Sequence, residues 1–318
     1  NTVAEIARRK RSNDFLLCAW DAHQYVASHY NDMIVVETGI GYGRGHFAPF
    51  KIFESYAMLH AYYGSRAVMY SGKMDWFDVV IPNYFDPADF EFSDQKEDWL
   101  LFLGRVYEPK GIYQAIAVAE TTRTRLKVAG PGPFRKPSPF VDYEGFAWLD
   151  KRRMLLSKAK AVIMPSIYVE PFGGVQVEAM MSGTPVISPD WGAFVECNLH
   201  GITGYRCRSL EQFCWAVNNI HCISPHTCRQ WAESNYSMDR IAAMYQEYFE
   251  MIMRSRNKDW NVVNPERRQL DWLKKHYPAP PMAALQGNLP MPPYDHQQEG
   301  AGRFVVLYDE NTRTMPPA

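Results

Sequence analysis

Residues 159–188 change twice between strand-like and helical patterns, and only a few folds accommodate such an alternation. The stretch opens with a short apolar run that is typical of a buried strand. The pattern becomes helical after Gly173 and Gly174, and Gly183 and Pro185 end the helix before a second apolar run begins. A strand, a glycine turn, a helix and another strand form the building unit of a parallel α/β sheet.

The turn in this unit carries residue types suited to a ligand. Glycines at the start of a helix let the backbone approach a bound group, and free N–H groups there favour an anion. Glu170 precedes the turn and Glu178 lies inside the helix. Carboxylates repel phosphate but accept strong hydrogen bonds from hydroxyl groups, so a nucleotide sugar fits both features. The alternative, which the residues alone leave open, is that Glu170 only caps the helix.

Length and composition limit the number of domains and the class of protein. The 318 residues suit two domains, and 47% hydrophobic residues suffice for a core. A net charge of −1 argues against a dedicated nucleic-acid-binding protein. No uncharged apolar run reaches the roughly 18 residues of a membrane-spanning helix. The expected location is cytoplasmic, with or without membrane association. The basic cluster Arg8 to Arg11 is a candidate for peripheral membrane contact, and a solvated helix end is the alternative.

The cysteines are interpreted as reduced and mostly buried thiols. No Cys-x-x-Cys pair occurs, and a chain of this size with a good core does not need disulfides. We therefore expect no metal site. The six positions are Cys18, Cys197, Cys207, Cys214, Cys222 and Cys228.

The first part of the chain reads as short strands around a glycine-rich loop. Residues 37–46 place four glycines at every second position, which differs from the Gly-x-Gly-x-x-Gly of a dinucleotide site. Glu37 and His46 in this loop are acid/base candidates, with structural hydrogen bonding as the alternative. Pro49 is expected to open a helix that includes Phe53. The strands are expected at 15–19, 33–37, 67–70 and 79–81.

Two cations follow the first strand of the second part. Residues 99–103 predict a buried strand, and Arg105 and Lys110 flank the start of the next helix. Such a pair can clamp a diphosphate, and two solvated surface cations are the alternative. A glycine turn, Gly130 to Gly132, ends the next strand. Because parallel strands end at one edge of a sheet, these loops and the Glu170 turn should converge in a doubly wound sheet.

Composition and helical periodicity predict the domain limits. An acidic, polar linker places a boundary near residue 95. Residues 237–256 predict a long helix whose apolar stripe serves packing. The expected organisation is a partial N-terminal Rossmann-like domain at 1–95, a C-terminal Rossmann-like domain at 96–256, a helical segment at 257–277 that returns to the first domain, and a Pro-rich tail at 278–318.

Four motifs carry a family resemblance. They are Phe102-Leu-Gly-Arg-x4-Lys-Gly111, Val128-Ala-Gly-Pro131, Pro165-Ser-x3-Glu-Pro-Phe-Gly-Gly-x3-Glu-Ala179 and Gly201-x2-Gly-Tyr205, and Ile81-Pro-Asn-Tyr-Phe-Asp86 is similar to the segment closing the family's first domain. With these motifs, residues 79–250 resemble the retaining, GT-B-fold glycosyltransferases of family 4, the glycosyl transferases group 1. The resemblance implies two Rossmann-like domains with parallel sheets, the first incomplete in this chain.

The resemblance also implies roles for individual residues. Arg105 and Lys110 would hold the donor diphosphate and stabilise the leaving group, Glu170 would contact sugar hydroxyls, and Glu178 would hold the ribose. His46 is a loose candidate for a first-domain histidine near the reacting sugar. Further donor contacts are expected from Gly104, Gly130, Pro131, Gly145, Phe146, Ala147, Phe172, Gly173, Gly174 and Val175.

The expected function is transfer of a hexose from a UDP- or GDP-sugar to a hydroxyl acceptor on a sugar, glycan or lipid-linked molecule, with retention and without metal or cofactor. One departure concerns the family's first domain, which is normally longer and has an early glycine turn with no counterpart here. We therefore expect an N-terminally truncated chain, and a fragment that binds nucleotide sugar without turnover is the alternative. A nicotinamide oxidoreductase is disfavoured, because no Gly-x-Gly-x-x-Gly opens a βα unit.

Overall fold

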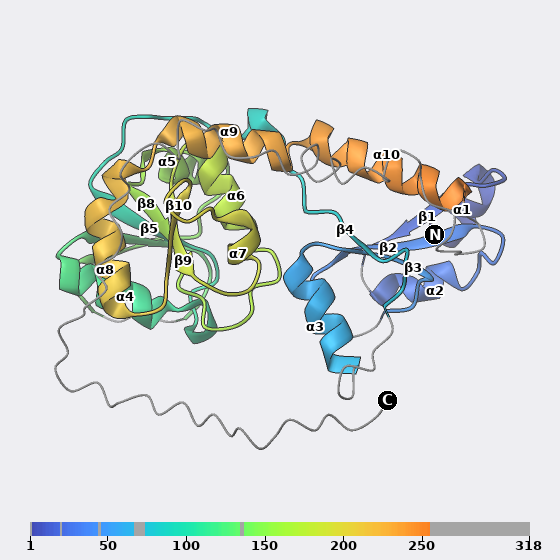
Figure 1. Ribbon diagram of the computed structural model, residues 1–318, viewed down its shortest axis with the longest axis horizontal. Coiled ribbons are helices and arrows are strands. Elements are labelled where there is room, and N and C mark those ends of the chain that lie inside the picture. Colours follow the sequence, from blue (N-terminus) through green and yellow to red (C-terminus); the bar gives the residue numbers. More distant parts are fainter. Residues whose placement is uncertain (1, 20, 44–45, 67–73, 134–136, 255–318) are drawn as a thin grey trace, which may run out of the picture.

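The computed structural model describes residues 2–19, 21–43, 46–66, 74–133 and 137–254. These residues form two parallel sheets with helices packed around them, which confirms the predicted α/β, GT-B-like class (Figure 1). The expected strand at 67–70, the helical segment at 257–277 and the tail at 278–318 lie outside the described residues.

The first sheet has the strand order β1-β2-β3-β4. Its strands are β1 (Phe15–Cys18), β2 (Ile34–Ile40), β3 (Phe50–Phe53) and β4 (Val79–Val80). The helices of this part are α1 (Thr2–Arg9), α2 (Gln24–Ala27) and α3 (Tyr56–Arg66). All three strand pairings are parallel, so the four strands end at the same edge of the sheet.

The second sheet has the order β10-β9-β8-β5-β6-β7, again with parallel pairings. Its strands are β5 (Trp99–Leu103), β6 (Arg125–Ala129), β7 (Val141–Gly145), β8 (Ala161–Ile163), β9 (Val186–Pro189) and β10 (Gly204–Cys207). Its helices are α4 (Ile112–Thr122), α5 (Leu149–Lys158), α6 (Gly174–Met181), α7 (Phe194–Cys197), α8 (Leu210–Asn219) and α9 (Pro225–Tyr236). Short 3-10 segments lie at Asp21–His23, Pro87–Asp89, Glu108–Lys110 and Ile220–Cys222.

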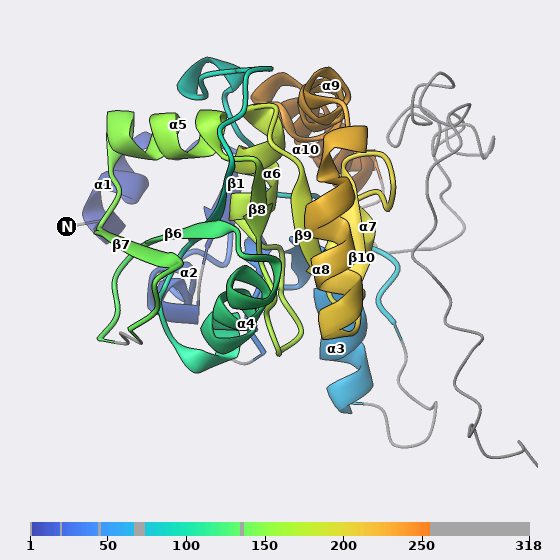
Figure 2. The ribbon, with the colours of Figure 1, turned by 90° about the vertical axis from the view of Figure 1, so that its left-hand side faces the viewer.

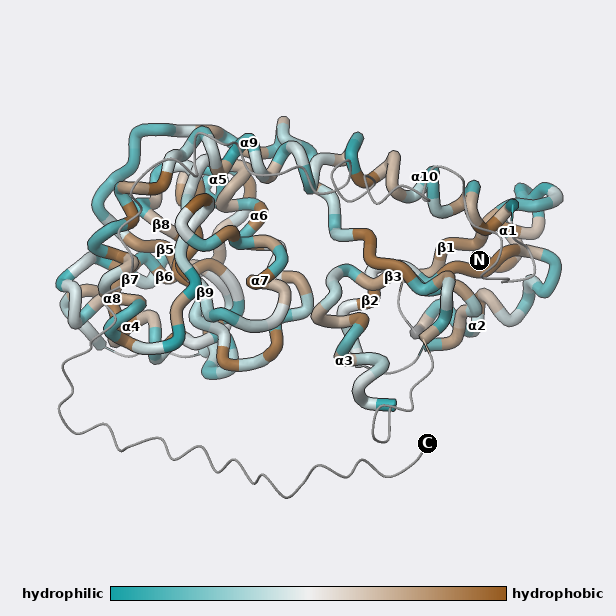
Figure 3. Tube along the Cα trace, viewed as in Figure 1, coloured by the Kyte–Doolittle hydropathy of each residue, from teal (hydrophilic) through white to brown (hydrophobic). Residues whose placement is uncertain are grey.

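Helices cover both faces of the second sheet, with α5, α6 and α9 on one face and α4 and α8 on the other (Figure 2). Every residue of β5 is therefore buried. This explains why β5 reads as a continuous apolar run rather than an alternating one. Hydrophobic residues gather along the strands, while the outer helices are mixed (Figure 3).

Two expectations for the first part were wrong. Strand β2 continues from Glu37 to Ile40, where the sequence indicated a loop. Residues 50–53 form strand β3 rather than the first turn of a helix after Pro49, and α3 begins only at Tyr56. Val36 pairs with Phe50 across the sheet, and Phe50, Ile52 and Phe53 are buried. Burial of this apolar segment in the sheet outweighs the local helix-start signal of Pro49.

Helix α10 (Met238–Arg254) connects the two halves. Its apolar stripe is confirmed as packing, but it packs against the first sheet, although residues 96–256 were assigned to the second domain. Ile241, Tyr248 and Ile252 are buried against Val36 and Ile52. The Tyr248 hydroxyl donates to the Phe77 carbonyl oxygen at 2.8 Å. The chain therefore returns to the first sheet at the start of α10, as Figure 1 shows.

Two segments connect the halves, one around Phe85 and one at residues 236–238 before α10, and they lie side by side. The Phe85 N–H donates to the Tyr236 carbonyl at 2.9 Å, and the Met238 N–H donates to the Phe85 carbonyl at 3.0 Å. These two bonds pair the connecting segments like neighbouring strands. The two halves are thus joined by a paired double crossing instead of one isolated linker.

Most cations of the N-terminal basic cluster have acidic partners. Arg8 and Arg9 both pair with Glu5, and Lys10 pairs with Asp32. The cluster therefore offers less free positive charge to a lipid surface than its sequence indicated. Within the described ranges, no helix combines the length and the apolar character needed to cross a membrane.

Candidate active site

The loops after β5 and β6 meet at the carboxyl edge of the second sheet, as predicted. The Gly104 N–H donates to Ala129 at 2.9 Å, and the Gly130 N–H donates to Gly145 at 2.8 Å. Gly130 has a φ of +140°, and a Cβ there would lie 1.8 Å from the Gly104 carbonyl oxygen. Only glycine fits this approach, so the Gly130-Pro131 turn is fixed by sterics against the β5 loop.

The loop carrying Lys110 packs against the segment that leads to Glu170. Gly111 has a φ of +79°, and a Cβ there would lie 1.9 Å from the Pro165 carbonyl oxygen. The Ile167 N–H donates to the Pro109 carbonyl at 3.0 Å. Two loops that are far apart in the sequence therefore become one surface beside the β5 and β8 strand ends.

Lys110 and Glu170 form an ion pair within this surface. The ammonium lies 2.9 Å from Oε1 and 2.8 Å from Oε2, and the Ser166 hydroxyl donates to Oε2 at 3.1 Å. The Glu170 side chain is 6% exposed and that of Lys110 is 19% exposed. The ammonium also lies 5.1 Å from the centre of the Tyr168 ring. In this structure Lys110 neutralises Glu170, so a bound phosphate would share the ammonium with that carboxylate.

The alternative role of Glu170 as a helix cap is wrong. The N-cap of α6 is Gly173, with a φ of +71° and no side-chain cap. The Glu170 carboxylate is directed to Lys110 and Ser166 instead. The Gln176 N–H donates to the Gly173 carbonyl at 2.9 Å, and the two preceding N–H groups, of Gly174 and Val175, begin the helix where an anion is favoured.

Arg105 is the unpaired cation of the site. Its side chain is exposed and lies over the Tyr107 ring, with the guanidinium carbon 5.0 Å from the ring centre. No carboxylate within the described ranges forms an ion pair with it. A free guanidinium beside the Lys110–Glu170 pair suits recognition of a phosphate by two parallel hydrogen bonds.

The Phe172 side chain belongs to the core rather than to a binding surface. It is 3% exposed and stacks against Phe85, with a centroid distance of 6.3 Å. Any contact of Phe172 with a donor would therefore be made by its backbone, and the donor contacts expected from residues 172–175 stay a prediction.

Glu178 lines a second part of the edge. Its Oε2 lies 2.6 Å from Nη2 and 2.7 Å from Nε of Arg152. Burial raises the pKa of Glu178, and the guanidinium of Arg152 opposes that shift. Both residues line a cavity of about 290 Å³ together with Asp89, Phe90, Trp148, Leu149, Arg153 and Leu156. Arg152 was missed from the sequence, because a basic residue on a predicted surface helix carries no distinguishing signal.

The expected donor contacts Gly145, Phe146 and Ala147 lie at the carboxyl end of β7. Gly145 has a φ of +70° and Ala147 is buried. Phe146 is 64% exposed and stacks on Trp148, with a centroid distance of 5.9 Å and an interplanar angle of 18°. An exposed aromatic pair at this position extends the surface around the Glu178 cavity.

The structure brings His46 and Glu37 together in the first half. His46 Nδ1 lies 3.2 Å from Glu37 Oε1, and the Tyr42 hydroxyl donates to the same oxygen at 2.7 Å. The N–H groups of Phe47 and Ala48 donate to Oε2. Glu37 is fully buried, and the contacts described for His46 are all within the first half. This geometry favours the structural alternative, and a catalytic role for either residue stays a prediction.

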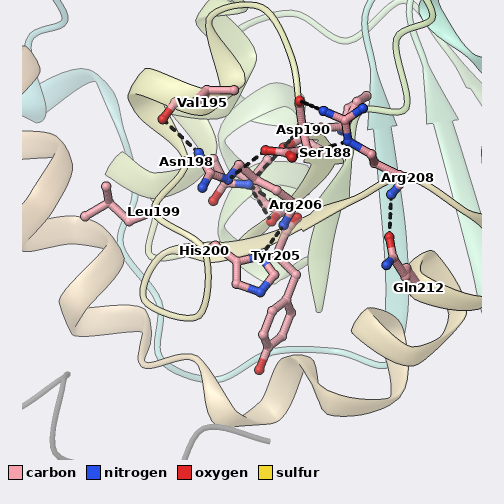
Figure 4. A network of polar contacts seen from close by, with 12 residues as sticks. Ser188, Asp190, Val195, Asn198, Leu199, His200, Tyr205, Arg206, Arg208 and Gln212 are labelled. Carbon is pink, nitrogen blue, oxygen red and sulfur yellow. Dashed lines mark hydrogen bonds and ion pairs between the residues drawn. The ribbon is translucent and has the colours of Figure 1, made fainter. Parts of the chain in front are cut away.

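A polar network joins the segments around β9 and β10 (Figure 4), and one backbone hydrogen bond connects the loop after β9 to the Glu170 turn. The Ala193 N–H donates to the Glu170 carbonyl at 3.0 Å, and Asp190, three residues earlier, pairs with Arg206 and Arg208. The buried Asn198 amide donates to Val186, Ser188 and Tyr205, which ties β9 to β10. None of these supports was predicted, because their partners meet only after the strands pair.

The turn after β3 contacts the Glu170 turn from the first half. The Ser55 hydroxyl donates to the Pro171 carbonyl oxygen. The Glu196 carboxylate accepts from the N–H groups of Tyr56 and Ala57, each at 2.8 Å, and so caps α3 from the second half. Burial raises the pKa of Glu196, and these two backbone bonds oppose the shift. The carboxyl edges of the two sheets thus face each other across the site.

The expectation of mostly buried cysteines is confirmed for Cys18, Cys197, Cys207 and Cys228, whereas Cys222 is exposed. Burial raises the pKa of Cys197 and of Cys228 to about 12, which keeps these thiols protonated and inert. In the part of the chain that the structure describes, no three His, Cys, Asp or Glu side chains are grouped to hold a metal ion.

Comparison with known proteins agrees with this geometry. Residues 97–221 match the family model described as glycosyl transferases group 1. An uncharacterized glycosyltransferase of Methanocaldococcus jannaschii is 28% identical over 214 residues, which are 58% of this chain and 54% of that protein. The glycogen synthase of Mycobacterium tuberculosis is 33% identical over 163 residues, 45% of this chain and 39% of that enzyme. The chain thus spans about half the length of these relatives or less.

Solved structures share the fold. AviGT4, a glycosyltransferase involved in avilamycin A biosynthesis, superimposes with a TM-score of 0.65 at 23% identity, over 79% of this chain and 78% of that one. HepE of Anabaena, solved with UDP and glucose, gives a TM-score of 0.62 at 18% identity, over 78% and 81% of the two chains. Residues 97–221 thus match the glycosyl transferases group 1 family, on a fold of two facing parallel sheets that is shared with solved glycosyltransferases.

Proposed function

We propose that this protein transfers a hexose from a UDP- or GDP-sugar to a hydroxyl acceptor with retention of configuration. The observation that carries the proposal is the unpaired Arg105 beside the Lys110–Glu170 pair, next to the glycine turn that begins α6. This edge combines groups for a diphosphate with a carboxylate for sugar hydroxyls. The family match over residues 97–221 supports the same assignment.

In the proposed reaction, the bond from the anomeric carbon to the diphosphate oxygen breaks, and the acceptor oxygen bonds to that carbon from the same face. The acceptor proton passes to the departing phosphate oxygen, which balances charge without a carboxylate nucleophile. Arg105, Lys110 and the α6 N-terminus stabilise the charge that develops on the diphosphate. Glu170 accepts hydrogen bonds from sugar hydroxyls, and Glu178, opposite Arg152, accepts them from the ribose.

The donor assignment is tested by nucleoside diphosphate binding. Arg105→Ala and Lys110→Ala should each weaken UDP or GDP binding by about 1–3 kcal/mol, as for other charge-assisted hydrogen bonds. Arg125→Ala serves as the control, because Arg125 begins β6 at the opposite edge of the same sheet. Titration calorimetry measures the affinities, after a thermal-shift panel of nucleotide sugars has identified the base. Unchanged affinity in both variants, with the fold intact, would contradict the assignment.

The role of Glu170 has a separate test. Glu170→Gln keeps the size and the Ser166 contact but removes the charge that Lys110 neutralises. Diphosphate affinity should hold or rise, because the ammonium is freed, while hexose transfer falls. Equal transfer rates in the variant and the parent protein would remove Glu170 from the mechanism.

A second candidate is a protein that binds nucleotide sugar without turnover. The observation that favours it is coverage, since the chain corresponds to 54% and 39% of two curated relatives. Release of UDP or GDP from a matching nucleotide sugar distinguishes the two candidates. Binding without release, in the presence of varied hydroxyl acceptors, would favour the second.

The expected domain limits and the expected cytoplasmic location stay predictions.

A further inference from the structure

The turn between β3 and α3 carries a carboxylate, Glu54. It belongs to none of the sequence motifs, and the proposed mechanism does not use it. Glu54 follows the last residue of β3, at the carboxyl edge of the first sheet, and is half-buried. Its neighbour Ser55 bonds to the Pro171 carbonyl, directly after Glu170 in the chain. Glu54 therefore lies where the first sheet meets the proposed donor site.

Within the described residues, Glu54 differs from three other carboxylates of the site in having neither a cation partner nor a pair of backbone N–H donors. Glu170 pairs with Lys110, Glu178 pairs with Arg152, and Glu196 caps α3. Glu54 accepts a single hydrogen bond of 2.8 Å, from the amide of Asn83 to Oε2. No ion pair and no other hydrogen bond to it is found in the described ranges. One oxygen of a half-buried carboxylate is thus left to accept a bond from something else.

The environment of this oxygen is shaped by the protein. A Cβ at Gly41 would lie 1.7 Å from Oε1, so the carboxylate rests against the backbone of the loop after β2. Burial raises the pKa of Glu54, the Asn83 amide opposes that shift, and the charge of Glu170 adds to it. The Ser55 to Pro171 hydrogen bond brings the turn that carries Glu54 against the turn that carries Glu170. Carboxylates on two adjoining turns attract hydroxyl groups and repel phosphate.

We propose that Glu54, oriented by Asn83 and Gly41, accepts a hydrogen bond from a hydroxyl group of the acceptor other than the one that reacts, and so positions the reacting hydroxyl opposite the donor sugar held by Glu170. The inference rests on the proposed function and deepens it, because it assigns the acceptor to polyols such as sugars or inositols. An acceptor with one isolated hydroxyl would gain little from a dedicated carboxylate. Glu54 is a positioning residue here, since the proton passes to the departing phosphate oxygen.

Binding of free sugars to the UDP-loaded protein tests this role, with GDP in its place if only GDP binds. Saturation-transfer NMR is recorded with glucose, galactose, mannose, N-acetylglucosamine and myo-inositol. At least one should give a signal with the parent protein. That signal should fall at least fivefold in Glu54→Gln, and in Gly41→Ala, whose new methyl group displaces the carboxylate. The UDP affinity should change by less than twofold in both variants.

Two controls separate this role from a structural one. Glu91→Gln removes an exposed carboxylate and should keep the sugar signal. Glu54→Asp keeps the charge and should retain part of the signal, which loss of packing alone would not explain. Equal signals in Glu54→Gln and the parent protein, or no signal from any sugar, would overturn the proposal.

The two proposals fail in different ways. If neither UDP nor GDP binds to the parent protein, the proposed function is wrong and the acceptor role falls with it. If Arg105→Ala weakens UDP binding while Glu54→Gln leaves sugar binding intact, only the acceptor role is wrong.

Discussion

Replacement of Lys110 by Met should destabilise the second half of the protein, whereas the same change at Arg105 should not. Lys110 Nζ lies within 2.9 Å of both Glu170 oxygens, and the Glu170 side chain is 6% exposed. Methionine keeps the length of the lysine but leaves a buried carboxylate with Ser166 as its main partner. Removal of one member of a buried ion pair costs roughly 3–5 kcal/mol.

The expected loss lies at the lower end of that range, because the Lys110 side chain keeps 19% of its surface exposed. A loss of about 3 kcal/mol corresponds to a fall in Tm of roughly 6–12 °C for a unit of this size. Arg105 has no carboxylate partner in the described ranges, and its contact with Tyr107 is exposed. Arg105→Met should therefore cost less than about 1 kcal/mol.

Thermal melts and urea titrations of the ligand-free variants measure both effects. The double variant Lys110→Met/Glu170→Gln should recover at least half of the loss, because no uncompensated charge remains. The reasoning would be refuted if Lys110→Met and Arg105→Met changed the Tm equally. It would also be refuted if the double variant were less stable than Lys110→Met alone.

Three further predictions follow from single contacts. Gly130→Ala should lower the Tm and weaken diphosphate binding, because its Cβ would lie 1.8 Å from the Gly104 carbonyl oxygen. Gly145→Ala, which has open space around its Cβ, should lower the Tm by less in the same thermal melts. Burial lowers the pKa of Lys96 to about 8 from its ordinary value of 10.5, so the unfolded chain binds more protons between these values. Stability relative to Lys96→Met should therefore rise with pH across that window, and a constant difference in urea titrations from pH 7.5 to 9.5 would contradict this. Glu196→Ala should lower the free energy of unfolding by about 1 kcal/mol, because it removes the cap of α3, and should speed proteolysis between the halves. The exposed Glu211→Ala is the control, and identical cleavage rates in the two variants would contradict the role of Glu196 as a cap between the halves.

Much of the second half could be predicted from the sequence because its signals are local. Strand β5 has the predicted bounds, since a buried parallel strand reads as an apolar run, and β6 ends at the predicted glycine turn. The glycine turn before α6 and the convergence of three loops at one edge followed from parallel connectivity. The sequence therefore located the donor half of the site and the residue types in it.

Partners and the first half were decided by the tertiary structure. Strand β3 was mistaken for helix because its pairing with β2 is a contact between distant segments that no local pattern encodes. The same holds for α10, whose stripe marks a buried face without naming the sheet that covers it. Lys110 and Glu170 are 60 positions apart, and Glu54 reaches the site only because the two sheets face each other. Local sequence thus determined which chemistry is present, and the packing of distant segments determined which charges are neutralised and which carboxylate is left for a ligand.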